Sequence, residues 1–169
     1  MGQAENKLKW CLQKAEKEGE EHRGLKKIRP DPNKADKHVN KAIHNLNTMQ
    51  YLMKGGYVDW AVSAGFYAMY HCLLAILAKN GYESRNQECT FAAIEILIRE
   101  GKSETSLESL KKIASFDGRA KTQEIIKLRE EFQYGTETIL ATGRIKEIID
   151  EAKELIETTK MDLKKNRTA

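Results

Sequence analysis

Hydrophobic positions recur at helical spacing along most of the chain, and one segment is apolar on nearly every side. Residues 57–80 read YVDWAVSAGFYAMYHCLLAILAKN, with one apolar stripe from Val58 to Ile76 and an opposite one from Trp60 to Ala78. A helix that is hydrophobic all round has to be buried on most of its faces. Its small residues would let neighbouring helices approach closely: Ala61, Ala64, Gly65 and Ala68. The pattern therefore predicts a central helix surrounded by other elements.

A membrane span is the alternative interpretation of this segment. Residues 61–78 are 18 positions without a formal charge, which is the lower edge of the length that a spanning helix needs. Polar and small residues interrupt the run, and Asp59 stands at its start. A single span would also leave the amphipathic segments on either side without a shared core. The pattern favours the buried helix.

The flanking segments have the one-sided periodicity of amphipathic helices. The expected helices cover residues 34–54, 85–100, a short stretch after 105, a run around 125–132, and 143–164. Pro30 and Pro32 mark the entry to the first of these, and Gly55-Gly56 marks its end. Ser84 and Gln87 have the spacing of a capping box for the helix at 85–100. No stretch alternates like a strand.

These elements predict an all-α protein with an antiparallel up-and-down bundle of four to five helices. The bundle covers residues 31–165, after a charged N-terminal helical arm at 1–30 and before a tail at 166–169. Residues 1–29 hold eight Lys or Arg against five Glu, so most of the chain's net charge of +4 lies there. We expect the arm to dock on the bundle through Leu8, Trp10 and Leu12, because short helices rarely persist alone. Contact with a partner or with phosphate is the alternative.

Charge and cysteine content narrow the function only slightly. A net charge of +4 permits a nucleic-acid partner without requiring one. The three cysteines, Cys11, Cys72 and Cys89, lack CxxC spacing, and no signal peptide is evident. This usage is typical of a reducing, cytoplasmic setting, with Cys72 and Cys89 packed as free thiols on apolar helix faces. We expect no metal site.

No common catalytic or cofactor motif is present, and no cofactor is expected. The sequence lacks a dinucleotide glycine fingerprint, a Walker loop, HExxH and a nucleophile elbow. The four histidines, His22, His38, His44 and His71, are dispersed along the chain. His71 lies inside the central helix near Tyr67 and Tyr70, where it is either a hydrogen-bonded core residue or part of a site.

Several segments together resemble the HEPN domain (higher eukaryotes and prokaryotes nucleotide-binding), in particular its small archaeal and bacterial members. The similarity lies in DWA at 59–61, FYAMYH at 66–71, GY at 81–82, NQECT at 86–90, and Arg129 with QYG at 133–135. It covers about residues 31–164. The resemblance implies a four-helix bundle that commonly forms a homodimer, association with RNA or nucleotides, and pairing with a minimal nucleotidyltransferase in toxin–antitoxin operons.

The sequence departs from the family at the catalytic motif. Ribonuclease members carry Arg, four to six residues, and then His, whereas this chain has Arg129 followed by Tyr134 and no histidine after His71. Cleavage of RNA without a metal needs a group that transfers protons near neutral pH, and tyrosine, with a pKa of about 10, is a poor one. Gln87 also stands where close relatives often have His.

We therefore expect binding of RNA or a nucleotide rather than its cleavage. The candidate binding residues are Arg129, Gln133, Tyr134, Asp59 and His71. Arginine offers bidentate contacts to phosphate and tyrosine a stacking surface. The alternatives are an adaptor bundle that makes protein contacts through the Trp10 arm, a ribonuclease with a rearranged site, and a purely solvated charge run around Arg129.

Overall fold

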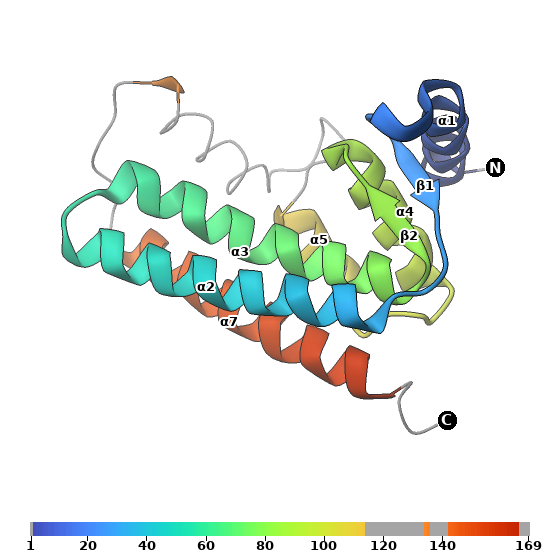
Figure 1. Cartoon of the computed structure of the whole chain (residues 1–169). Coiled ribbons are helices and arrows are strands. Elements are labelled where there is room, and N and C mark those ends of the chain that lie inside the picture. The colour runs from blue at the N-terminus through green and yellow to red at the C-terminus, as the bar shows by residue number, and fades with distance from the viewer. Residues whose placement is uncertain (1, 114–133, 136–141, 166–169) are drawn as a thin grey trace.

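The computed structural model describes residues 2–113, 134–135 and 142–165 (Figure 1). This part of the chain is mostly helical, as expected, and the run at 125–132 lies outside it. The elements in chain order are α1 (Gln3–Glu18), the 3-10 turn η1 (Gly19–Glu21), β1 (Leu25–Lys27), α2 (Pro32–Lys54), α3 (Val58–Lys79), β2 (Tyr82–Ser84), α4 (Gln87–Arg99), α5 (Leu107–Ile113) and α7 (Thr142–Lys165).

The α3 helix lies at the centre of these elements. It contacts α2, α4, α5, α7 and β2, and α2 and α7 run alongside it in Figure 1. Its length and composition would suffice to cross a bilayer, but 72% of its apolar stretch is buried inside the chain. Its largest fully buried side chains include Phe66, Met69, Leu73 and Ile76. The prediction of an enclosed central helix is confirmed.

Gly65 lies where three helices pack closely together. A Cβ atom at this position would lie 2.7 Å from Met49 Sδ on α2 and 2.9 Å from Ile148 Cγ2 on α7. Distances this short leave no room for a methyl group. The small residue predicted to permit close packing is thus needed where α2 and α7 both meet α3.

Local signals set the ends of α2 much as the sequence indicated. The Asp31 side chain accepts a hydrogen bond of 2.8 Å from the Lys34 backbone N–H, and Pro32 is the first residue of the helix. This is the N-cap arrangement that satisfies an otherwise unpaired helix N–H. At the other end Gly56 has φ of 81°, a conformation that glycine adopts without steric cost.

The predicted start of α4 was wrong. The N-cap is Asn86, whose side-chain oxygen accepts from the Cys89 N–H at 3.0 Å. Ser84 instead donates to the Asn86 carbonyl at 2.9 Å and accepts from the Thr90 hydroxyl at 2.8 Å. Both Ser84 and Asn86 are good capping residues, and the sequence contained no signal that chose between them.

Two short strands were also missed. β1 and β2 pair antiparallel, with Leu25 opposite Ser84 and Lys27 opposite Tyr82. Each strand has three residues, which is too short to reveal an alternating pattern. This sheet joins the arm to the segment that follows α3.

The arm docks on the rest of the molecule, although not through Trp10. Ala4, Cys11 and Ala15 are buried, and Leu8 and Leu12 pack against the core. The Trp10 side chain is 46% exposed and lies beneath the ammonium groups of Lys7 and Lys14, at 4.5 and 5.1 Å from the ring centre. The hydrophobic stripe of α1 therefore faces α4 and β1, with Trp10 off to one side.

A disulfide between Cys11 and Cys89 links α1 to α4. The expectation that Cys89 is a free packing thiol was wrong, because docking of the arm brings together two cysteines separated by 78 positions. Cys72 does remain free and buried, and burial raises its pKa to about 12. The thiol of Cys72 is therefore unreactive at neutral pH.

We expect Gly65→Ala to lower the free energy of unfolding by about 1–3 kcal/mol, since the added methyl group overpacks the junction of α2, α3 and α7. Gly143→Ala is the matched control, because nothing lies within 4 Å of a Cβ at that position on α7. The control should be neutral or slightly stabilising. Urea unfolding measures both variants, and equal stability of Gly65→Ala and the wild type would contradict the packing described.

The disulfide should contribute about 4 kcal/mol to stability, because it closes a long loop in the unfolded chain. We expect reduced protein and the Cys11→Ala variant to unfold at clearly lower urea concentration than oxidised protein. Thiol titration of denatured, unreduced protein should give one free thiol, that of Cys72. Three free thiols in freshly purified protein would contradict the pairing.

Candidate functional site

The structure brings two of the histidines together. His38 on α2 and His71 on α3 face each other with their Nδ1 atoms 3.0 Å apart and their ring centres 5.2 Å apart. One Nδ1 donates a hydrogen bond and the other accepts it, which requires at least one neutral ring. The view of the histidines as dispersed was therefore wrong for this pair, because they meet only when α2 and α3 pack antiparallel.

The surroundings keep both imidazoles uncharged near neutral pH. Burial is the main cause that lowers the pKa of His38 to about 4, and the nearby His71 and Lys34 contribute to the same shift. Burial also lowers the pKa of His71, with Lys41 acting in the same direction. The pair is thus a hydrogen-bonding unit flanked by lysines rather than a source of positive charge. Among the described residues, no group of three or more His, Cys, Asp or Glu is placed to hold a metal ion.

Exposed aromatic side chains continue from His71 along the same face of α3. The exposed fractions are 42% for Tyr67 and 62% for Trp60, and Tyr57 is 59% exposed just before the helix. Tyr70 differs from them, since its hydroxyl contacts that of Thr90 at 3.0 Å and burial raises its pKa. The face of α3 that carries Trp60 and Tyr67 is therefore the open one.

The other predicted site residues do not join His71 in the described part of the chain. Asp59 is half-buried in the first turn of α3, about 18 Å from His71 along the helix axis. Tyr134 is 79% exposed. Arg129 and Gln133 lie outside the described residues. The structure thus adds His38, Lys34 and Lys41 to the set. Their helical spacing places them on one side of α2, but the packing of α2 against α3 is what brings them to His71.

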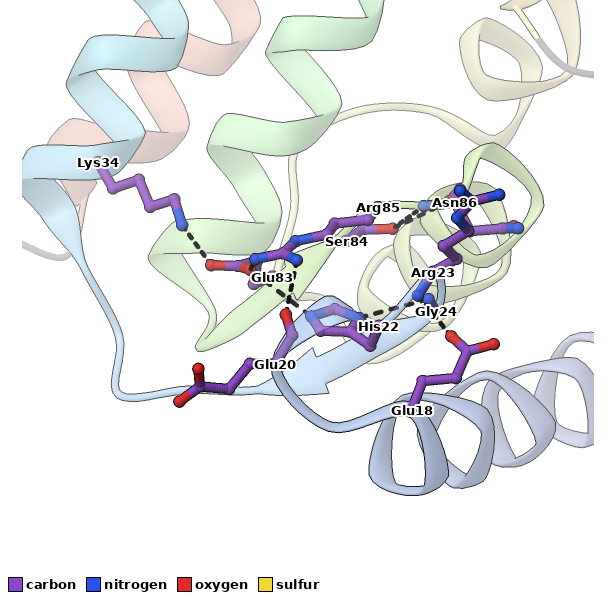
Figure 2. A network of polar contacts seen from close by, with 10 residues as sticks. All are labelled: Glu18, Glu20, His22, Arg23, Gly24, Lys34, Glu83, Ser84, Arg85 and Asn86. Carbon is purple, nitrogen blue, oxygen red and sulfur yellow. Dashed lines mark hydrogen bonds and ion pairs between the residues drawn. The ribbon is translucent and has the colours of Figure 1, made fainter.

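A second polar cluster centres on Glu83 of β2, and sequence reasoning missed it (Figure 2). One carboxylate oxygen lies 2.6 Å from Lys34 Nζ, and the other lies 3.2 Å from Arg85 Nη2. The hydrogen bond from Lys34 is the main cause that holds the pKa of Glu83 below its usual value. The cluster joins α2, β2 and the arm, which contributes His22.

Comparison with known proteins agrees with the resemblance drawn from the FYAMYH segment and its surroundings. The family model described as HEPN domain matches residues 35–162, from the first turn of α2 to the last turn of α7. A search of curated proteins gave no match. Since the matched range covers well over half of the sequence, the chain belongs to the HEPN domain family, whose helical domains are generally associated with nucleotides and RNA.

Proposed function

We propose that this HEPN protein binds RNA or a nucleotide on the open face of α2 and α3. The observation that carries the proposal is the neutral His38–His71 pair, which lies beside Lys34 and Lys41 and continues into the exposed ring of Tyr67. Single-stranded RNA is typically bound by such a combination of cations for the phosphates and aromatic rings for the bases.

Each group on this face has a distinct role in the proposal. Lys41 is exposed on α2 and supplies a charge for a phosphate. The imidazoles of His38 and His71 can donate to or accept from a ribose hydroxyl without adding charge. Tyr67, which lies one turn before His71 on α3, offers a stacking surface to a base.

We further propose that the family motif contributes to the same function. Arg129 would hold a phosphate through two parallel hydrogen bonds, and Gln133 and Tyr134 would contact the base. Asp59, at the start of α3, would accept hydrogen bonds from a base or a ribose. A cytoplasmic location is part of the proposal, and the complete burial of Cys11 and Cys89 would shield their disulfide from the thiol reductants of that compartment.

The proposed assembly is a homodimer that partners a minimal nucleotidyltransferase in a toxin–antitoxin-like pair. Exposed large aromatics gathered on one surface often mark an interaction site. Tyr57 and Trp60 give the start of α3 this character. Two copies packed through this end of α3 would leave Tyr67 and the His38–His71 pair of each copy open to RNA.

The second candidate function is RNA cleavage at a rearranged site, and the histidine pair is the observation that favours it. Neutral His71 could take a proton from a ribose 2′-hydroxyl while Lys41 stabilises charge on the phosphate. An adaptor role without nucleic acid is the third candidate, favoured by the exposed Trp10 on the docked arm.

Labelled single-stranded RNA should be retained by the protein at about 50 mM salt and much less at about 200 mM. Lys41→Ala and Arg129→Ala should each reduce retention and leave the RNA intact. Each should also reduce the slope of log affinity against log salt concentration by about one, as expected for the loss of one phosphate contact. Lys153→Ala, on an exposed position of α7, is the control and should bind like the wild type. Cleavage of the RNA that is abolished by His71→Asn would identify a ribonuclease. Absence of RNA retention at both salt concentrations would favour the adaptor role.

The wild type should have about twice the chain mass of 19.3 kDa in light scattering after gel filtration. Replacing both Tyr57 and Trp60 with alanine should shift it toward the monomer mass, because the change removes two large exposed aromatic groups from the start of α3. Met161→Ala, at a similarly exposed position on α7, should leave the mass unchanged. A monomeric wild type would contradict the proposed assembly.

A further inference from the structure

A groove of about 480 Å³ lies between the C-terminal half of α1 and strand β1. Both elements contribute to its apolar lining, which consists of Leu12, Ala15 and Leu25. Both also contribute to its charged lining, which consists of Glu16, Lys26 and Lys27. All of these residues precede residue 35, where the match to the family model begins. The groove therefore belongs to the arm and shares no residue with the open face of α2 and α3.

The groove follows the edge of β1 that is not paired with β2. All three residues of β1 line the groove, and its described lining includes no residue of β2. Successive residues of a strand point to opposite faces, so a groove that all three touch runs along the edge of the strand rather than over one face. β2 pairs with the other edge, and α1 contacts β1 as well (Figure 1).

The hydrogen bonds between β1 and β2 identify the backbone groups that the sheet already uses. The Arg85 N–H donates to the Gly24 carbonyl at 3.0 Å, and the Ile28 N–H donates to the Gly81 carbonyl at 2.9 Å. Hydrogen-bonded pairs alternate with non-bonded pairs along an antiparallel ladder. Of the three residues in β1, only Lys26 therefore bonds to β2 through its backbone.

Leu25 and Lys27 direct their backbone groups to the opposite side, toward the groove. Each has one N–H donor and one C=O acceptor. Within the described residues, these groups make no hydrogen bond outside the ladder with β2. An edge that presents unpaired N–H and C=O groups is a template for another extended chain.

The two walls of the groove are held in place by contacts at one end. A Cβ atom on Gly24 would lie 2.6 Å from the Cys11 carbonyl oxygen, so α1 and the start of β1 touch there. The disulfide to Cys89 fixes Cys11 in turn. At the other end Gly19, with φ of 65°, turns the chain away from α1. The strand edge and the apolar wall are thus positioned before a ligand arrives, which lowers the entropic cost of binding.

The charges along the groove favour an acidic ligand. Lys26 and Lys27 are exposed, and within the described residues neither is part of an ion pair. Glu16 on the α1 wall is also exposed, so two lysines and one glutamate leave a net positive charge. The arm around the groove has the same sign, with eight Lys or Arg against five Glu in residues 1–29. A segment with acidic side chains is therefore complementary.

We propose that this groove binds an extended acidic segment of a partner protein, which pairs with the open edge of β1 as a third strand. The backbone of the segment bonds to Leu25 and Lys27, as in other cases of strand addition. Its side chains alternate between two faces, so apolar ones contact Leu12 on α1 while acidic ones meet the two lysines. The proposal does not rest on RNA binding, and either can fail alone.

The same features disfavour two other occupants. A second copy that paired through this edge would bring Lys26 and Lys27 of both chains together, and like charges opposite each other destabilise a pair of strands. RNA offers phosphates to the lysines but no row of backbone groups that matches the N–H and C=O groups of the edge. An acidic peptide satisfies both the charges and the backbone.

A fluorescein-labelled peptide of alternating glutamate and valine, about six residues long, tests the proposal by fluorescence anisotropy. The full-length, oxidised protein should bind this peptide. The same peptide with all its backbone nitrogens methylated is the matched control, because it keeps every side chain but cannot donate backbone hydrogen bonds. It should not bind. Equal binding of the two peptides, or binding of neither, would overturn the proposal.

Charge reversal at the edge tests the choice of an acidic segment. Lys27→Glu should weaken binding of the glutamate–valine peptide by about fivefold or more, because repulsion replaces an exposed ion pair. It should also bind the corresponding lysine–valine peptide better than the wild type does. Lys27 stands opposite Tyr82, so the reversal brings no like charges together within the sheet. Lys9→Glu, exposed on α1 away from the groove, is the control and should bind like the wild type.

Amide hydrogen exchange followed by NMR locates the peptide on the strand edge. The glutamate–valine peptide should slow exchange at the N–H groups of Leu25 and Lys27, because both gain a partner. The N–H of Lys26, which already bonds to β2, should change little and is the internal control. Unchanged exchange at Leu25 and Lys27 with saturating peptide would overturn the proposal. This measurement uses the wild type, so it decides the matter if Lys27→Glu does not fold.

Two further measurements separate the other occupants from the proposed one. Single-stranded RNA should not displace the peptide, and Lys41→Ala should bind the peptide like the wild type while losing RNA. Displacement by RNA would overturn the proposal in favour of a nucleic-acid surface. Light scattering should give the same mass for Lys27→Glu as for the wild type. A lower mass would show that a second copy fills the groove and would also overturn the proposal.

Discussion

The need to cover α3 on nearly all sides governs the arrangement of the other elements. Exposure of apolar surface to water costs free energy, and α3 has apolar stripes on opposite faces. For this reason α2, α4, α5, α7 and β2 all pack against it. Gly65 permits a close contact between α3, Met49 on α2 and Ile148 on α7. The face left open carries Trp60, Tyr67 and His71, whose polar edges tolerate water. The surface used in the proposed function is thus the part of α3 that no neighbouring element covers.

The sequence predicted those features that depend on local signals. Asp31-Pro32 and Gly55-Gly56 determine the ends of α2 through hydrogen bonding and backbone freedom, and the apolar period determined which helix lies at the centre. The choice of Asn86 over Ser84 as the N-cap of α4 depends on where β2 ends, which is a tertiary matter. The same holds for the three-residue strands, whose pairing joins segments more than fifty positions apart.

Less of the candidate site than of the fold could be predicted from the sequence. His71 was singled out, but its partner His38 becomes visible only when α2 and α3 are placed side by side. The pairing of Cys11 with Cys89 and the cluster around Glu83 both depend on how the arm docks. Resemblance to the HEPN family could not reveal them either, because the matched range begins after the arm, at residue 35.

The Cys11–Cys89 bond divides the molecule into a closed ring and an open tail. The ring runs from α1 through α2, α3 and β2 to the start of α4, while α5 and α7 follow it on a free chain. A protease that cuts once at the Gly55-Gly56 turn would leave both fragments covalently joined. Within the described residues, the last helix is held to the ring by side-chain packing and by polar contacts such as that from Lys79 Nζ to the Asp162 carbonyl. Detachment of α7 can therefore uncover α3 while the ring keeps its connectivity.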